Sequence, residues 1–161
     1  MLTIAQTLSL VVATAATGLS AGLLYAYSCS VMPGLARTDD RTFVTAMRAI
    51  NEAILNGWFA FSSAGALLAT PLTVALHLTQ PSPIRLWGGA ALLLLGLAVV
   101  VTARRNVPLN DALAARGTGQ PVATHDVART SFEAPWIRWH RIRTLASVAA
   151  FGCLLAAVAL H

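Results

Sequence analysis

WIRWHRIR, at residues 136–143, leads directly into the last apolar stretch of the chain. It holds two tryptophans, three arginines and one histidine, whereas residues 144–161 carry no charged side chain. Side chains three, four and seven positions apart share one face of a helix. The aromatic and polar side chains that would share a face here are Trp136, Trp139, His140, Arg143 and Ser147. This pattern indicates a membrane boundary at which one polar helix face points into the protein.

The composition of the chain indicates an integral membrane protein. Of its 161 residues, 57% are hydrophobic and 11% are charged, against about 25% charged in a typical soluble domain. The uncharged stretches are residues 1–36, 53–84, 86–103 and 144–161. Each reaches or exceeds the roughly 18 residues that suggest a membrane-spanning helix. We therefore predict an all-α fold, an integral membrane four-helix bundle that forms a single domain over residues 1–161.

The distribution of arginine predicts the orientation in the membrane. We expect spans over about 3–32, 54–78, 86–103 and 144–161, with connections at 33–53 and 104–143. All eleven basic residues are arginines, and ten of them lie in the first and third connections. Because arginine-rich connections stay on the cytoplasmic side, both connections are predicted to be cytoplasmic and both termini to lie outside, in the inner (cytoplasmic) membrane. The net charge of +5 then follows from topology and implies no nucleic-acid partner.

The first connection is predicted to contain an additional amphipathic helix. Thr38-Asp39-Asp40 offers the short hydrogen-bond acceptors and negative charge that suit a helix N-terminus. Apolar side chains then recur at helical spacing, at Phe43, Met47, Ile50 and Ile54. This helix either lies on the membrane surface or continues into span two.

Small residues recur every fourth position in span one, at Thr14, Gly18, Gly22 and Ala26. Such a stripe lets a neighbouring helix approach closely. It serves either packing within one chain or the formation of a homo-oligomer.

The third connection opens with Asn106-Val107-Pro108-Leu109-Asn110-Asp111. A proline disfavours helical geometry in the residue before it, so Val107 is expected to be extended. Asn110 or Asp111 would then cap a new helix, or these polar groups would belong to a site at the end of span three. Span one is likewise expected to stop at Pro33-Gly34.

The predicted topology gathers polar groups at the cytoplasmic mouth of the bundle. Because polar groups near bilayer depth are costly, they usually face a cavity or the bundle interior. The candidates are Tyr25, Tyr27, Asn51, Asn106, Asn110, Asp111, Trp136, Trp139, His140 and Arg143. The alternative is that the tyrosines, tryptophans and arginines are interfacial anchors. No paired-histidine or CxxC metal motif is present, and the four histidines are scattered.

Four segments together carry a resemblance to a known family. They are LYAYSCSVMPGL at 24–35, AMRAINEAILN at 46–56, NVPLNDAL at 106–113 and WIRWHRIRT at 136–144. The set resembles the anthrone oxygenase family of small four-span membrane proteins, over nearly the whole chain. The resemblance implies functional roles for Asn51, Asn106, Pro108, Asn110, Trp136, Trp139 and Arg143. The sequence departs from the family pattern at His140, where asparagine is expected.

The resemblance implies that an anthrone or related aromatic polyketide is oxidised to a quinone by O2, without a metal or flavin cofactor. Such chemistry needs a base, donors for the developing oxyanion and flat surfaces for the rings. Our hypothesis makes His140 the base, with Asp111 as the fallback, while Arg143, Asn106 and Asn110 stabilise the enolate oxygen. The substrate-binding set is completed by Trp136, Trp139, Asn51 and Tyr25. The alternatives are a metal-dependent oxidation and a non-catalytic membrane protein that binds a small molecule or assists assembly.

Overall fold

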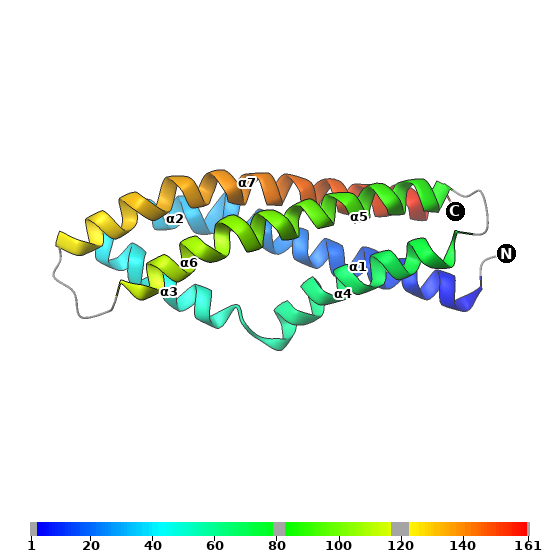
Figure 1. The fold of residues 1–161 in the computed structure, drawn as a ribbon, viewed down its shortest axis with the longest axis horizontal. Helices are drawn as coiled ribbons and strands as arrows, with labels where there is room; N and C mark the ends of the chain where they lie inside the picture. The colour runs from blue at the N-terminus through cyan, green and yellow to red at the C-terminus, as the bar shows by residue number, and fades with distance from the viewer. Residues whose placement is uncertain (1–2, 79–82, 117–122, 161) are drawn as a thin grey trace.

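The fold is an elongated bundle of helices, seen in a computed structural model that describes residues 3–78, 83–116 and 123–160 (Figure 1). No strand occurs within these ranges. The elements in chain order are α1 (Ile4–Ala26), the π-helical turn η1 (Tyr27–Val31), α2 (Met32–Leu35), α3 (Asp40–Ala53), α4 (Gly57–Leu76), α5 (Pro83–Val101), the π-helical turn η2 (Thr102–Asn106), α6 (Val107–Ala115) and α7 (Ala123–Ala159). The predicted all-α bundle with an additional helix, α3, is confirmed.

Four helical segments of the described chain are long and apolar enough to cross a membrane. They are Ile4–Leu35, Gly57–Leu76, Pro83–Ala115 and His125–Ala159. The chain is therefore an integral membrane protein, whose surroundings are a lipid bilayer. At 1.5 Å per residue, the 37 residues of α7 span about 55 Å, which exceeds a hydrocarbon core of about 30 Å. One end of the bundle must therefore project beyond the apolar layer, while the orientation predicted from arginine remains a prediction.

The helices run further than the sequence predicts. Pro33 does not end span one, and Val107 before Pro108 is helical, with φ −61° and ψ −50°, so the expected extended conformation is wrong. Both prolines follow a π turn, whose last amide reaches back five residues: Met32 N–H donates to the Tyr27 carbonyl, and Val107 N–H to the Thr102 carbonyl. The wider turn moves the backbone carbonyl with which a proline ring would clash in a regular helix. Consequently neither Asn110 nor Asp111 caps a helix.

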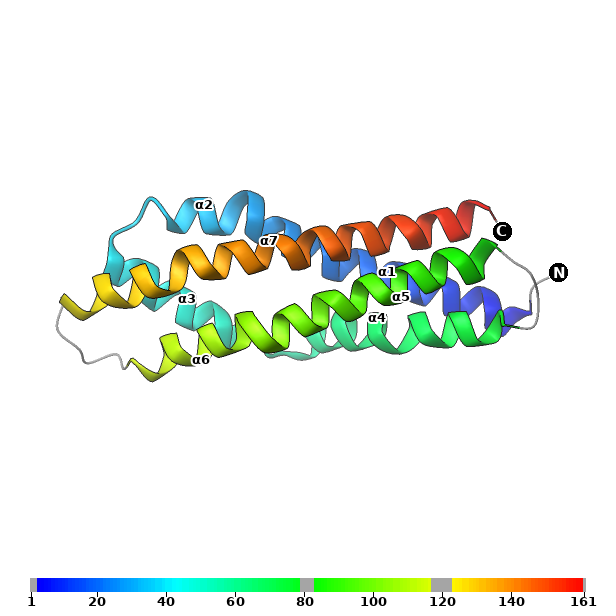
Figure 2. The same ribbon diagram turned by 45° about the horizontal axis from the view of Figure 1, so that its top comes forward.

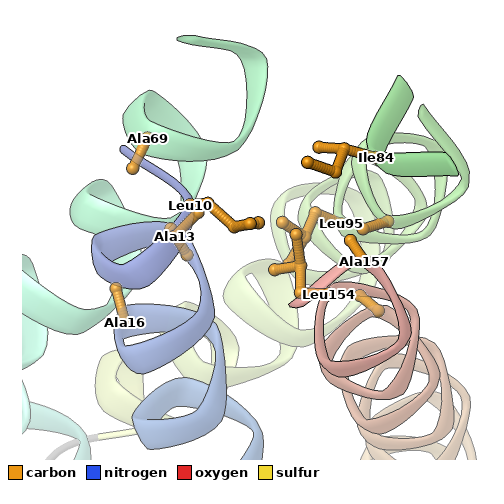
Figure 3. Close-up of a cluster of buried hydrophobic side chains, with 11 residues drawn as sticks. Leu10, Ala13, Ala16, Ala69, Ile84, Leu95, Leu154 and Ala157 are labelled. Carbon is orange, nitrogen blue, oxygen red and sulfur yellow. The ribbon is translucent and has the colours of Figure 1, made fainter. Parts of the chain in front are cut away.

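Two apolar clusters hold the bundle together, one at each end. The first joins α1, α4, α5 and α7 near the two termini, and Figure 3 shows Leu10 reaching from α1 toward Leu95 and Leu154. The second joins the helices at the opposite end, α2, α3, α6 and α7, around Phe43 and Met47. Figure 2 shows the same division, with α3 and α6 beside the first half of α7. The α3 helix is amphipathic as predicted, since its buried residues are Phe43, Val44 and Met47.

Arg129 of α7 fastens the start of α3 to the bundle. Its guanidinium contacts Asp40 at 3.0 Å and Glu133 at 2.7 Å, and it donates to the Thr38 and Ala36 carbonyls. Asp39 caps α3 by accepting from the Thr42 amide at 3.0 Å, which confirms the predicted helix start. Hydrogen bonds from Thr42, first from its hydroxyl, hold the pKa of Asp39 below its ordinary value.

The small-residue stripe of span one is used for packing within the chain at one of its positions. A Cβ added at Gly18 would lie 2.8 Å from Cε2 of Phe151 on α7, whereas one added at Gly22 would meet nothing within 4 Å. Gly18 therefore sets the close approach of α1 and α7. Gly22 and Ala26 stay exposed.

Gly18→Ala is expected to destabilise the bundle relative to Gly22→Ala. Both substitutions gain the same helix propensity, but the first must push the Phe151 ring aside, which typically costs about 1–3 kcal/mol. The thermal unfolding midpoint of each purified variant measures the difference. Equal midpoints would show that the ring yields freely and that Gly18 does not set the helix spacing.

Candidate functional site

A partly open cavity of about 550 Å³ lies between the two apolar clusters of the bundle. This volume lies within the usual range for small-molecule sites, about 300–1,000 Å³. One part of its wall is apolar and comes mainly from α1, α4 and α5, including Leu23, Leu24, Phe59, Ala66, Leu67, Leu95, Ala98 and Val99. The polar part comes mainly from α3, α6 and α7, namely Arg48, Asn51, Glu52, Asn110, Asp111, Trp136, Arg143 and Ser147. The cavity can thus hold a largely apolar ligand that carries polar groups at one end.

Each of two π turns begins at a residue that lines this cavity. Tyr27 begins η1 and Thr102 begins η2, and both line the wall. A π turn contains one residue more than a regular helical turn, so it shifts the faces on which the following side chains lie. Such turns frequently occur at functional sites. Here one π turn lies within the helical segment Ile4–Leu35 and the other within Pro83–Ala115.

Arg143 is the cation held most firmly at the cavity. Its Nε and Nη2 lie 3.2 and 3.1 Å from Nδ1 of His140, and its Nη1 donates to the Thr102 hydroxyl at 3.3 Å. The Thr102 hydroxyl in turn donates to the Ala98 carbonyl at 2.8 Å, which turns its lone pairs toward the arginine. The guanidinium carbon lies 5.4 Å above the Trp136 ring, within the range of a cation–π contact. Arg143 is therefore a preorganised donor with no carboxylate partner among the described residues.

His140 is buried behind the cavity wall instead of lining it. It is 1% exposed and stacks on Trp136, with ring centroids 4.5 Å apart and planes 11° apart. Its Nε2 lies 3.0 Å from the Leu24 carbonyl, which can only accept, so the proton belongs on Nε2 and Nδ1 is the acceptor for Arg143. Both ring nitrogens are thus occupied. The arrangement suits a residue that holds Arg143 in place better than one that takes a proton from a ligand.

Trp136 is almost wholly buried and orients Asn110. It is 1% exposed, and its indole N–H donates to Oδ1 of Asn110 at 2.8 Å. Because an indole N–H only donates, it fixes the oxygen of the amide and leaves the Asn110 Nδ2 group free to donate to another acceptor. Phe132 and Tyr27 contact the same indole at centroid distances of 5.9 and 6.2 Å. Trp136 therefore serves as a rigid wall rather than as an open stacking surface.

The sequence profile of the family described as anthrone oxygenase matches residues 43–153. The chain belongs to the anthrone oxygenase family. The matched region runs from α3 into α7 and contains Asn51, Asn110, Asp111 and Arg143 of the cavity wall. No curated protein and no solved structure matches the chain.

Four of the site residues predicted from the sequence do not line the cavity. His140 lies behind the wall, as described above. Asn106 is fully buried in η2, where its amide donates to the Trp136 carbonyl at 3.3 Å. Trp139 lies under two arginines, Arg105 at 4.7 Å and Arg138 at 5.6 Å from its ring. Tyr25 is 59% exposed, in agreement with the alternative that it is an interfacial tyrosine.

The cavity is also lined by residues that were not predicted from the sequence. Arg48, Glu52 and Thr102 line it, and Ser147, which shares the predicted face of α7, does so as well; Tyr27, a candidate without an assigned role, also lines it. Arg48 could have been found from the sequence, since it lies one helical turn before Asn51. Thr102 could not, because it is an isolated hydroxyl side chain in the otherwise apolar stretch 86–103.

The described ranges contain no group of three or more histidine, cysteine, aspartate or glutamate side chains that could hold a metal ion. His77, at the opposite end of the bundle, is buried, and its Nδ1 lies 2.7 Å from the Thr73 carbonyl. The titratable groups of the cavity itself are Tyr27, Arg48, Glu52, Asp111 and Arg143. These are the groups available for proton transfer and for stabilising an anion.

Proposed function

We propose that the protein is an oxygenase that converts an anthrone-type aromatic substrate to the quinone with O2. The observation that carries this proposal is that a preorganised cation, Arg143, and a carboxylate, Asp111, line the same largely apolar cavity. Family membership supports an oxygenase-type role. The substrate and the mechanism are our inference from the chemistry of the wall.

The reaction consumes one O2 for each anthrone. A base removes a proton from the ring methylene, and the electron pair delocalises onto the carbonyl oxygen as an enolate. The enolate carbon forms a bond to O2 and becomes a hydroperoxide after protonation. Loss of the remaining hydrogen at that carbon, with cleavage of the O–O bond, gives the second carbonyl and one water molecule. The protein therefore has to supply a base and to stabilise a negative oxygen.

The roles of the cavity residues follow from their positions. Asp111 is exposed, lines the cavity and makes no hydrogen bond to a described side chain. It is therefore better placed than His140 to act as the base. Arg143 and the Nδ2 group of Asn110 are the donors for the enolate oxygen. The apolar wall holds the rings. His140 moves from the role of base to that of a positioning residue for Arg143.

We propose that no metal or flavin takes part, because an enolate of this kind reacts with O2 directly. Metal analysis of the active preparation tests this point, and activity that rises in proportion to bound metal would contradict it. We further propose that the cavity lies at the cytoplasmic face, as the arginine distribution predicts.

The two roles considered for His140 are separated by His140→Asn and His140→Ala. Asparagine offers an oxygen that accepts from Arg143, whereas alanine leaves that guanidinium without this acceptor. A hydrogen bond to a charged group contributes about 1.5–3 kcal/mol, so His140→Ala is expected to lower turnover about tenfold or more. His140→Asn is expected to stay within about threefold of the wild type. If both variants fold but lose nearly all turnover to the same extent, His140 is the base.

The proposed function is tested by quinone formation from a simple anthrone. Purified protein in lipid nanodiscs is compared with empty nanodiscs, because anthrones also oxidise slowly by themselves. Formation of the quinone absorbance well above the background supports the oxygenase. Saturable anthrone binding without accelerated quinone formation would favour the non-catalytic binding role.

A further inference from the structure

Arg48 is a cation at the cavity that the proposed reaction does not use. It lies on the face of α3 that also carries Asn51 and Glu52, and all three line the wall. Its Nε is buried and has no hydrogen-bond partner. Among the described residues the ion pairs involve Arg129 instead, so neither Glu52 nor Asp111 neutralises Arg48.

The Arg48 guanidinium has neither a hydrogen bond nor an ion pair with a described residue, so a ligand that supplies an acceptor to it gains affinity. A guanidinium has a fixed fork of N–H groups that matches the two oxygens of a carboxylate. The two carboxylates of the wall, Glu52 and Asp111, are exposed and therefore keep contact with solvent. Arg48 is thus available for a second anionic group of the ligand, whereas Arg143 is held by His140 and Thr102 and serves the enolate oxygen in the proposed reaction.

The distribution of polarity along the cavity orients such a ligand. On α5 and α6 the lining extends from Leu95 to Ala114, nineteen residues of helix or about 28 Å. The apolar part of the wall is near Leu67 on α4 and Leu95 on α5, whereas Arg48 lies on α3 with the polar lining residues Asn51 and Glu52. Figure 1 shows that α3 lies beside α6, toward the end of the bundle away from the termini. A fused-ring ligand would place its rings against the apolar wall and its acidic group toward α3.

We propose that Arg48 binds a carboxylate of the ligand, so that the cavity selects an amphipathic, carboxylated fused-ring aromatic molecule. This inference names the substrate class and rests on the proposed function only for the identity of the reaction. Binding itself is independent of turnover and can be measured with a compound that has no oxidisable methylene.

The test compares anthracene-2-carboxylate with its neutral analogue 2-(hydroxymethyl)anthracene. Binding to the protein in nanodiscs is followed by anthracene fluorescence, with empty nanodiscs to correct for partition into lipid. The wild type is expected to bind the carboxylate about tenfold more tightly than the alcohol, the effect of one charge-assisted contact. Arg48→Gln is expected to bind both equally, and Arg48→Lys to keep part of the preference.

Arg41→Gln is the matched control, because it removes an exposed arginine of the same helix that does not line the cavity. It is expected to keep the tenfold preference. Three results would overturn the proposal. The wild type could show no preference for the carboxylate, the preference could survive in Arg48→Gln, or it could be lost in Arg143→Gln instead of Arg48→Gln. Turnover of a neutral anthrone by a protein without the preference would leave the oxygenase standing and refute only the carboxylate site.

Discussion

Arg143→Gln is expected to lower quinone formation by about 10²–10³-fold, the usual effect of removing one donor from an oxyanion site. Glutamine keeps a donor but loses the charge and the fixed fork that His140 and Thr102 hold. The loss should appear mainly in kcat, because the negative charge on the substrate oxygen develops only as the methylene proton leaves.

The control for this variant is Arg141→Gln, two residues earlier on the same helix. Arg141 is exposed and does not line the cavity of about 550 Å³, so its replacement should leave turnover unchanged within about twofold. Thermal unfolding midpoints of both variants show whether the bundle is intact. A folded Arg143→Gln protein with wild-type kcat would remove this residue from the oxyanion role.

Asp111→Asn is expected to lower kcat by about 10²–10⁴-fold, the range typical of a missing general base. The amide has nearly the same shape as the carboxylate but cannot take the methylene proton at neutral pH. Asp111 is exposed at the cavity and makes no hydrogen bond to a described side chain. The substitution should therefore leave the unfolding midpoint unchanged.

Glu52→Gln is the informative comparison, because Glu52 is the other carboxylate of the cavity wall. Its replacement should cost much less than that of Asp111. If the large loss follows Glu52 instead, the base lies on α3 and the substrate binds in the opposite orientation. Asp126→Asn, on the exposed surface of α7, controls for the general effect of removing an acidic residue.

The fold class was accessible from the sequence because the physical signals are strong. Uncharged stretches of the required length predict membrane spans, and the spacing of Phe43, Met47 and Ile50 predicts α3. The helix ends were less accessible. Residues 123–143 were expected to form a connection, yet the aromatic side chains Phe132 and Trp136 pack against α3 and α2 at this end, which supports a continuous α7.

The candidate site was predicted in part. Residues whose direction follows from regular helical spacing, such as Trp136 and Arg143, reach the cavity wall as expected. The tyrosine pair shows the limit: Tyr27 lines the cavity while Tyr25 faces outward. Residues two positions apart lie about 200° from each other around a helix, so only one of the two tyrosines could face the interior, and their spacing does not tell which one. The two occupied nitrogens of His140 could not be predicted either, because the Leu24 carbonyl comes from a distant part of the chain.

The most direct test of the oxygenase assignment is the fate of ¹⁸O2 in a simple anthrone oxidation by the purified protein. We expect one O2 consumed and one ¹⁸O atom incorporated for each quinone formed, at a rate far above that of Arg143→Gln and of empty nanodiscs. Equal rates in the wild type and the variant, or a quinone without the label, would contradict an oxygenase site built around Arg143.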